Sequence, residues 1–156
     1  MKIYNKIYYT FEKDWIRINN YIPKNKVIWE AFSNGEYEGV DYLKSICKEV
    51  ITHSGDFFDN NEGECVITNP PFSIKQQVLR RLKEIDKPFI CILPTLSLQT
   101  KYMKEIFNGE IQVIMPTKKN LIYIYLLIHP TQAQIDFLIF LFVLIILQPY
   151  LIYLYV

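Results

Sequence analysis

Up to about residue 119, short apolar runs alternate with longer stretches in which apolar and polar positions are mixed. The apolar runs predict strands at residues 26–32, 49–52, 64–68, 89–93 and 111–115. Helices are predicted between them at residues 39–48, after Pro71, and at 98–107. Strands separated by helices of this length pair in parallel through right-handed crossovers. The pattern therefore predicts a doubly wound α/β sheet, whose ligands bind at the carboxyl ends of the strands.

The stretch after Pro71 has the spacing of an amphipathic helix. Its apolar positions fall on one helical stripe, formed by Ile74, Val78, Leu82 and Ile85. Charged positions such as Lys75, Arg81 and Glu84 point elsewhere around the same helix. We expect this helix to pack its stripe on the sheet and to leave its basic side chains in water.

The composition changes abruptly at Lys119. All 17 basic residues lie at or before this position, and of the 16 acidic residues only Asp136 lies after it. Residues 137–147 are uniformly apolar, and a second apolar run follows Gln148-Pro149. We therefore divide the chain into a domain at residues 1–120 and a hydrophobic C-terminal tail at residues 121–156.

Composition and charge narrow the function classes. With 51% hydrophobic residues and 15% aromatics, a core can form and disorder of the whole chain is excluded. A net charge of +1 gives no overall sign of a polyanion partner. The 3 cysteines and 2 histidines are too few and too far apart for a metal site, so we expect no metal and thiols that are buried. The N-terminus does not resemble a secretory signal, which predicts a cytoplasmic protein.

Asn69-Pro70-Pro71-Phe72 carries the chemistry that can be inferred from the sequence. It follows a predicted strand and opens a helix. An exocyclic amine is a weak nucleophile because its lone pair is delocalised into the ring. An asparagine oxygen and a backbone carbonyl can accept its hydrogens and oppose that delocalisation. Two prolines stiffen the corner, and Phe72 can stack on a base that has left the duplex.

A structural interpretation of the same residues stands beside this one. In it, Asn69 caps the following helix and the prolines occupy its first turn. It accounts for the asparagine and one proline, but not for the second proline or the aromatic residue. We favour the catalytic interpretation.

The chain resembles the adenine-N6 DNA methyltransferases, particularly short forms of phages and large DNA viruses. Three segments carry the resemblance in this order: Trp29-Glu30-Ala31-Phe32, Gly55-Asp56-Phe57-Phe58 and Thr68-Asn69-Pro70-Pro71-Phe72-Ser73. It extends from about Asp14 to Lys119 and includes Lys87-Pro88-Phe89 and Pro94. It implies a Rossmann-like, S-adenosylmethionine-dependent methyltransferase sheet, incomplete at its C-terminal end.

The resemblance also implies roles for individual residues. Asn69, Pro70, Pro71 and Phe72 correspond to the catalytic segment of these enzymes. Glu30, Phe32, Gly35, Asp56 and Phe57 correspond to their cofactor-binding residues, with Phe58 as an alternative to Phe57. The first loop departs from the usual Phe-x-Gly-x-Gly. One glycine, Gly35, is out of register, and the carboxylate of Glu36 stands where the carboxylate of the cofactor would approach.

DNA is the partner that the resemblance implies, but basic residues support it only weakly. The candidates lie on and after the helix that follows the motif and at the end of the domain: Lys75, Arg80, Arg81, Lys83, Lys87, Lys118 and Lys119. Such residues more often form a solvated helix face than a track for phosphates. No separate target-recognition domain is visible.

Three interpretations of the tail remain. Residues 137–156 form a membrane anchor, or they continue the sheet as a hydrophobic closing portion. The third interpretation is a foreign terminus that arose when the original reading frame was lost. We rank the foreign terminus first, so membrane association through this segment is possible but not favoured. In related proteins the sheet closes with an antiparallel pair, and residues 121–128 fit one such strand.

Two hypotheses from different classes follow. The first is an active S-adenosylmethionine-dependent methyltransferase for the N6 amino group of adenine in DNA. RNA adenine and a protein glutamine amide are alternative acceptors, since both present a planar amine. The second is a catalytically inactive remnant, or a membrane-associated protein that retains the fold.

Overall fold

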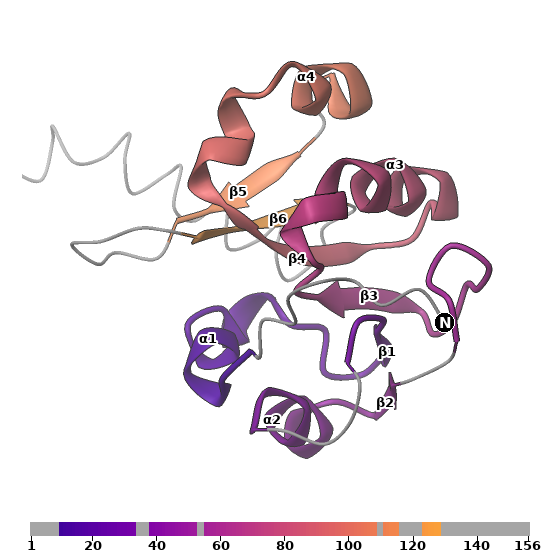
Figure 1. Ribbon diagram of the computed structural model, residues 1–156. Coiled ribbons are helices and arrows are strands. Elements are labelled where there is room, and N and C mark those ends of the chain that lie inside the picture. Colours follow the sequence, from indigo (N-terminus) through magenta and orange to yellow (C-terminus); the bar gives the residue numbers. More distant parts are fainter. Residues whose placement is uncertain (1–9, 34–37, 53–54, 109–110, 116–122, 129–156) are drawn as a thin grey trace, which may run out of the picture.

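A central sheet with helices on both faces forms the protein (Figure 1). The computed structural model describes residues 10–33, 38–52, 55–108, 111–115 and 123–128, the last by their backbone. The strands are β1 (Val27–Glu30), β2 (Glu49–Thr52), β3 (Cys65–Thr68), β4 (Phe89–Pro94), β5 (Gln112–Ile114) and β6 (Tyr123–Ile128). Their spatial order is β2-β1-β3-β4-β6-β5. β1, β2, β3 and β4 pair in parallel, while β6 runs antiparallel to both β4 and β5. The predicted α/β class is confirmed.

The central strands β3 and β4 are mostly continuous apolar runs, because both of their faces are covered. Within β3, Cys65 and Ile67 pack into one hydrophobic cluster, whereas Val66 packs into the other. The same alternation holds in β4, where Ile90 and Ile92 lie on the opposite face from their neighbours Phe89, Cys91 and Leu93. Side chains of a strand alternate between faces, so a run that is buried throughout needs a layer on each side.

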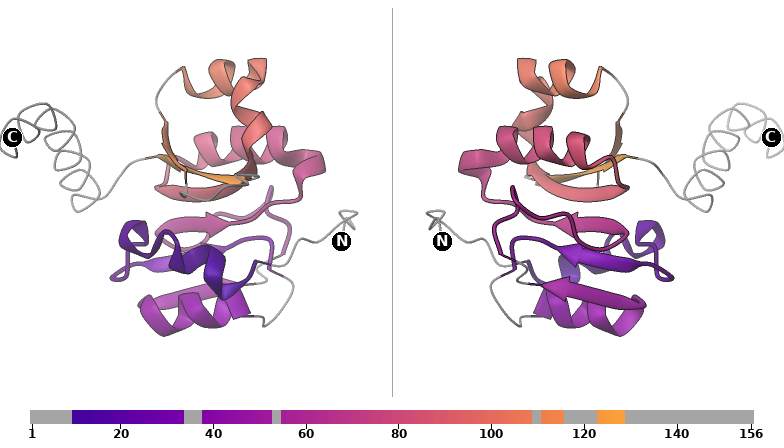
Figure 2. Two further views of the ribbon diagram at one scale, coloured as in Figure 1. Left: turned by 90° about the vertical axis from the view of Figure 1, so that its left-hand side faces the viewer. Right: turned by 90° about the vertical axis from the view of Figure 1, so that its right-hand side faces the viewer.

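The helices supply these two layers. Four α-helices and three short 3-10 helices are described: α1 (Glu12–Ile16), η1 (Asn19–Tyr21), α2 (Glu38–Ile46), η2 (Phe72–Ile74), α3 (Lys75–Ile85), η3 (Thr95–Gln99) and α4 (Lys101–Phe107). Buried residues of α3 and α4 share one cluster, whereas Trp15 of α1 and Leu43 of α2 share the other. Figures 1 and 2 show the strands lying between these two pairs of helices.

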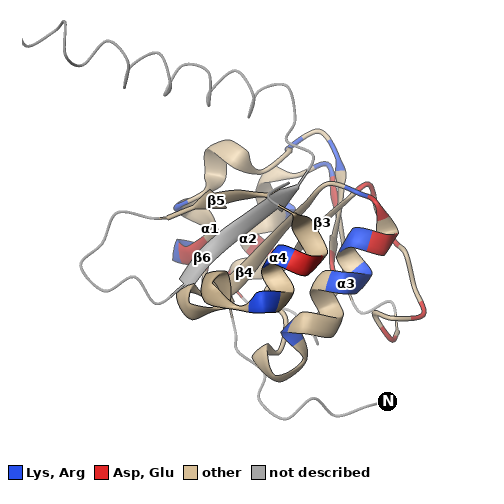
Figure 3. Cartoon of the chain, turned by 90° about the horizontal axis from the view of Figure 1, so that it is seen from above, with Lys and Arg blue, Asp and Glu red and all other residues tan. Residues whose placement is uncertain are grey.

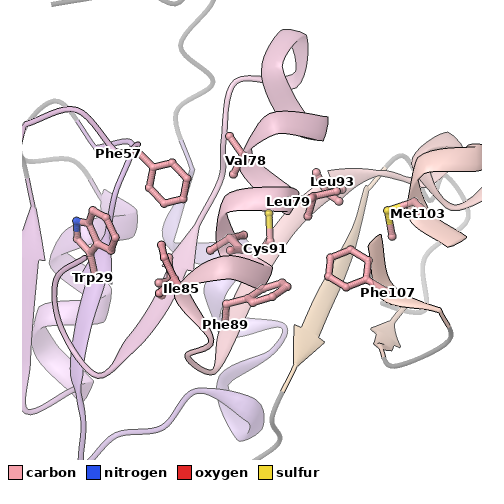
Figure 4. Packing of buried hydrophobic residues seen from close by; sticks show 12 residues of the cluster. Trp29, Phe57, Val78, Leu79, Ile85, Phe89, Cys91, Leu93, Met103 and Phe107 are labelled. Atoms are coloured by element: carbon pink, nitrogen blue, oxygen red, sulfur yellow. The ribbon is translucent and has the colours of Figure 1, made fainter. Parts of the chain in front are cut away.

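The helix α3 forms where the spacing predicts it. Val78, Leu82 and Ile85 are buried on its inner side, and Figure 4 shows Val78 and Ile85 among the aromatic residues of the core. The helix ends because Asp86 adopts a left-handed conformation with φ 54°, followed two residues later by Pro88. Full burial of each large apolar side chain contributes about 1.5–3 kcal/mol, which stabilises the helix far more than its propensity does.

β6 is the antiparallel closing strand that residues 121–128 were expected to supply. Its six residues pair with β4 from Phe89↔Ile128 to Pro94↔Tyr123. The beginning of the predicted tail, Tyr123–Ile128, is thus a strand of the sheet. Residues 129–156, and with them the three interpretations of the tail and any further closing element, lie outside the described residues. In the part of the chain that the structure describes, no helix is long and apolar enough to cross a membrane.

Candidate functional site

The winding of the sheet reverses between β1 and β3. From β1 the chain passes to β2 on one side, and from β3 it passes to β4 on the other. β1 and β3 are direct neighbours, with Trp29 in register with Val66. In open α/β sheets, such a reversal leaves a crevice outside the carboxyl ends of the two strands. The sequence places Ala31-Phe32 after one strand and Asn69-Pro70 after the other, so both predicted segments begin at this point.

A hydrogen bond between two buried side chains joins the two strands here. The Thr68 hydroxyl donates to Oε1 of Glu30 at 2.6 Å. Glu30 is 2% exposed and Thr68 is fully buried. Burying a carboxylate is costly unless it accepts hydrogen bonds. The negative charge of Glu30 also helps to raise the pKa of the neighbouring Cys91 thiol, although desolvation of the thiol is the larger cause.

Buried polar residues are concentrated at this edge. Of the five described polar or charged residues that are buried, four lie at or just beyond the carboxyl ends of β1, β3 and β4: Glu30, Ser33, Thr68 and Ser97. The fifth is Thr10. Polar groups that are removed from water weaken a fold unless they are paired, so their accumulation at one edge indicates a function there.

The Asn-Pro-Pro-Phe corner does not have the geometry of a helix cap. Pro71 occupies the N-cap position of η2, and Ile74 occupies that of α3. Neither position provides a side-chain capping bond. Asn69 therefore lies two residues before the first helical cap, and both prolines precede the helix. The structural interpretation, with Asn69 as cap and prolines in the first turn, is wrong.

The corner is only partly open to solvent. Pro70 and Pro71 are buried, while Asn69 and Phe72 are half-buried. The Oδ1 atom of Asn69 is itself buried. Nζ of Lys75 donates to the carbonyl of Phe72 at 3.1 Å, which ties the corner to the first turn of α3. The prolines thus anchor the corner in the core, and the two side chains expected to contact an acceptor lie at its margin.

Aromatic rings from β1, from the residues after it and from the loop after β2 pack together near the candidate site. Phe57 lies 5.3 Å from Trp29 and 4.9 Å from Phe32 between ring centroids. Figure 4 shows Phe57 and Trp29 together at the edge of the core. Phe57 is 2% exposed, so in this structure it is a core residue. Phe32 and Phe58 are half-buried and have more surface to offer a ligand.

Asp56 begins a turn after β2. Its Oδ1 accepts the backbone N–H of Phe58 at 3.0 Å, and its carbonyl accepts from the side chain of Asn60 at 2.8 Å. Gly55 precedes it with φ 100°, a conformation that disfavours side chains. Asp56 therefore starts a turn through its own side chain, and it remains half-buried. Gly35, together with Asn34 and Glu36, lies outside the described residues.

The basic residues after the motif are occupied within the protein. Nζ of Lys87 donates to the carbonyls of residues 61, 62 and 63, at 3.3, 3.2 and 2.7 Å. Arg81 donates to the carbonyl of Asn60 at 3.3 Å, and Arg80 pairs with Glu105 at 3.6 Å. Figure 3 shows acidic and basic residues mixed along α3 and α4. These contacts favour the solvated, structural interpretation of the residues on α3 over a phosphate track. Lys118 and Lys119 lie outside the described residues.

The thiols are not suited to nucleophilic chemistry. Burial raises the pKa of Cys47 to about 11 and that of Cys65 to about 12, and it raises the pKa of Cys91 as well. Cys65 and Cys91 are buried as expected, whereas Cys47 is half-buried. Among the described residues, no group of three or more His, Cys, Asp or Glu could hold a metal ion.

Ser33, Thr68 and Ser97 are buried polar residues at this edge to which the sequence assigned no role. Thr68 is the last residue of β3 and directly precedes Asn69. A polar residue at the end of an otherwise apolar strand, immediately before a motif, was a signal that could have identified it. Ser97 lies in η3, just before the helix that the sequence predicts at residues 98–107.

No family model and no curated protein matches the sequence. Solved structures with a similar fold include a protein-(glutamine-N5) methyltransferase from Alicyclobacillus acidocaldarius, with a TM-score of 0.46 and 11% identity over 76% of this chain and 90% of that one. Precorrin-6y C5,15-methyltransferase from Geobacter metallireducens has a TM-score of 0.42 and 12% identity, over 79% and 90%. Ribosomal protein L11 methylase from Lactobacillus delbrueckii has a TM-score of 0.47 and 9% identity, over 75% and 76%.

These likenesses concern the fold. At such low identity and with TM-scores below 0.5, they add no argument about substrate or activity. The strand order, the reversal between β1 and β3, and the antiparallel β6 establish the Rossmann-like α/β sheet independently of them.

Proposed function

We propose that the chain is an S-adenosylmethionine-dependent methyltransferase that acts on the N6 amino group of adenine in DNA. The observation that carries the proposal is the position of Asn69-Pro70-Pro71-Phe72. The corner follows β3 directly at the reversal of the sheet, and Asn69 does not cap the helix that follows. The resemblance of the three ordered segments supplies the choice of cofactor and acceptor.

The residues around the reversal suit the polar and flat parts of such a cofactor. S-adenosylmethionine supplies an electrophilic methyl group on a sulfonium sulfur when it is bound. Asp56 is half-buried after β2, where a carboxylate can accept bonds from ribose hydroxyls. Phe32, half-buried after β1, offers a ring face to a flat adenine. Glu30 is a buried carboxyl group beside the corner, near the place where the positively charged donor would lie.

At the acceptor side, each residue of the corner has a separate task. The Asn69 amide oxygen and the carbonyl of Pro70 would accept the hydrogens of the amine and make its lone pair available. Phe72 would stack on the base after it has left the duplex. Pro71 would keep the carbonyl in place because its ring fixes φ, here −57°. The amine releases its proton to water once nitrogen has taken the methyl group.

This mechanism requires the buried Oδ1 of Asn69 to become accessible when an acceptor binds. Hydrogen bonds in a site without ligands often reach their working geometry only in the substrate complex. Rotation of the half-buried Asn69 side chain is the smallest change that meets this requirement.

The direct test is incubation with tritiated S-adenosylmethionine and adenine-containing DNA, followed by nucleoside analysis. We expect label in N6-methyladenine. Asn69→Ala should lower turnover by at least about 100-fold, the usual loss when a group that stabilises developing charge is removed. Asn61→Ala is a matched control, because Asn61 is exposed in the loop at the opposite edge. Label that survives in Asn69→Ala would reject the mechanism.

Parallel reactions decide the acceptor. Single-stranded RNA with adenine and a peptide with glutamine are offered at the same concentration as DNA. If RNA or glutamine is labelled and DNA is not, the chain is a methyltransferase, but its substrate is not DNA.

A catalytically inactive remnant is the second candidate. It is favoured by the burial of both prolines and of the Asn69 oxygen, together with the departure of the loop around Gly35 from the family pattern. Calorimetry separates the two candidates. Micromolar affinity for S-adenosylmethionine supports the enzyme, whereas the absence of binding by the folded chain supports the remnant.

A further inference from the structure

Thr68 occupies the place where the two halves of the candidate site meet. It ends β3, and its backbone continues directly into the corner that begins at Asn69. Its side chain reaches in the other direction and bonds the last residue of β1, Glu30. One residue therefore joins the segment that precedes the cofactor loop to the segment that carries the acceptor chemistry.

The surroundings make this bond difficult to replace. Both side chains are buried, so water cannot readily take over the role of the hydroxyl as donor. At 2.6 Å, the bond lies at the short end of the usual range for a hydroxyl that donates to an oxygen. On its other side, Thr68 is in register with Cys91 of β4, which is also fully buried. The side chain therefore has little room to adopt another orientation.

We propose that Thr68 is a positioning residue that fixes the Glu30 carboxylate and thereby sets the spacing between bound S-adenosylmethionine and the Asn69 corner. This inference rests on the proposed function and adds to it a residue without contact to either substrate. Methyl transfer needs the donor carbon and the accepting nitrogen close together and in line, so a small shift between the two segments is costly.

The experiment compares Thr68→Val, Thr68→Ser and a matched control. Valine keeps the shape and removes the hydroxyl, while serine keeps the hydroxyl and removes a methyl group. Thr100→Val is the control, because the Thr100 hydroxyl also donates a 2.6 Å hydrogen bond, to the carbonyl of Ser97 before α4. For each variant, the dissociation constant for S-adenosylmethionine is measured by calorimetry, kcat is measured at saturating cofactor, and the thermal midpoint is recorded.

We expect Thr68→Val to weaken cofactor binding by about tenfold and to lower kcat by a similar factor. Thr68→Ser should remain within about threefold of the unmodified chain in both quantities. Thr100→Val should leave both unchanged even where it lowers the thermal midpoint. In a Glu30→Gln background the valine substitution should have a much smaller effect, since the two residues act through one bond.

Several results would overturn the inference. Unchanged affinity and kcat in Thr68→Val would do so, as would a serine variant as impaired as the valine variant. If the valine variant does not fold, Thr68→Ala replaces it in the same comparison. An unmodified chain that neither binds S-adenosylmethionine nor transfers methyl groups rejects the proposed function itself. A chain that does both, with an unaffected Thr68→Val, rejects only the role of Thr68.

Discussion

The polar groups at the two ends of the central strands differ in burial. At the amino ends of β1 and β3, the polar contacts are local and structural. The backbone N–H of Val27 donates to Oε2 of Glu64 at 2.9 Å, and the N–H of Glu64 donates back to the carbonyl of Val27 at 2.8 Å. Lys87 satisfies three consecutive carbonyls of the loop that precedes β3. Most of these groups are exposed or only partly buried.

At the carboxyl ends of the same strands, the polar groups are buried. Glu30 and Thr68 bond each other out of contact with water, and the oxygen of Asn69 is buried beside them. We infer that the polar groups at the amino ends serve stability, and that those at the carboxyl ends serve function. The polar contacts at the amino ends need little desolvation and stabilise the fold. The polar groups at the carboxyl ends are buried, although apolar groups of the same size would stabilise the fold as well or better. Substitutions at the two ends should therefore have different consequences.

The largest effect on stability is expected for Gly63→Ala at the amino end. Gly63 has φ 58°, and an added Cβ would lie 2.9 Å from the carbonyl oxygen of Val27. The left-handed conformation costs alanine about 1–2 kcal/mol, and the contact with rigid backbone adds to it. We expect the free energy of unfolding, measured in urea, to fall by about 2–4 kcal/mol.

Asn108→Ala serves as its control, because Asn108 also has a positive φ of 46° but already carries a Cβ. A loss of about 1 kcal/mol or less is expected there. Equal losses in the two variants would show that crowding at Gly63 contributes nothing.

The matched pair Glu30→Gln and Glu64→Gln sharpens the comparison most directly. Both glutamates accept a hydrogen bond, one at each end of the strands. Glu30→Gln should weaken S-adenosylmethionine binding by about tenfold, or about 1.4 kcal/mol, with little loss of thermal stability, because a buried charge is removed along with its desolvation cost. Glu64→Gln should leave the affinity within about twofold of the unmodified chain. If calorimetry finds the same affinity for S-adenosylmethionine in both variants, the carboxyl ends of the strands have no special role in cofactor binding.

Much of the fold was predictable because the central strands β3 and β4 are buried on both faces. Mostly apolar runs such as Cys65–Thr68 and Phe89–Pro94 allow one interpretation as strands once helices separate them. The segment at residues 98–107 was less clear. It divides into η3 and α4 with Thr100 between them in extended conformation, a break that apolar periodicity does not reveal. The strand at residues 26–32 ends early at Glu30, because the chain leaves the sheet where the candidate site begins.

The motif of the candidate site was predictable from the sequence, but the contacts between its residues were not. A sequence shows that Asn69 follows a strand, and the structure brings it next to the end of β1. The partner of Thr68 is 38 residues away in sequence, and no local pattern pairs it with Glu30. Phe57 is a second example. The sequence places it in a motif but gives no sign that its ring is buried against Trp29. Its role as a cofactor contact stays a prediction, with Phe58 as the more exposed alternative.

A smaller effect is expected for Lys87→Met, which keeps an apolar stem and removes the ammonium group. Three carbonyls at residues 61–63 would lose their donor. Since that loop is partly exposed, water replaces much of the lost bonding, and we expect a loss of about 1 kcal/mol in unfolding free energy. Methyl transfer to DNA should be unchanged. Lys101→Met is the control, because the side chain of Lys101 is 91% exposed. A marked loss of DNA binding in Lys87→Met alone would assign that lysine to a nucleic-acid surface instead.

The smallest effect concerns the pH dependence of stability at the amino end. The hydrogen bond from the Val27 N–H lowers the pKa of Glu64, the main cause of its shift. A carboxyl with a lower pKa in the folded state binds its proton more readily when unfolded. Its contribution is therefore fully present above the unfolded pKa of about 4.3, and it is lost as the pH falls through the lower folded value. The difference in unfolding free energy between the unmodified chain and Glu64→Gln should be constant from pH 8 to about pH 5 and should shrink below about pH 4.3. Urea titrations of both proteins across this range measure it. A difference that grows as the pH falls would have the wrong sign for this hydrogen bond, and the amino end would then need another source of its stability.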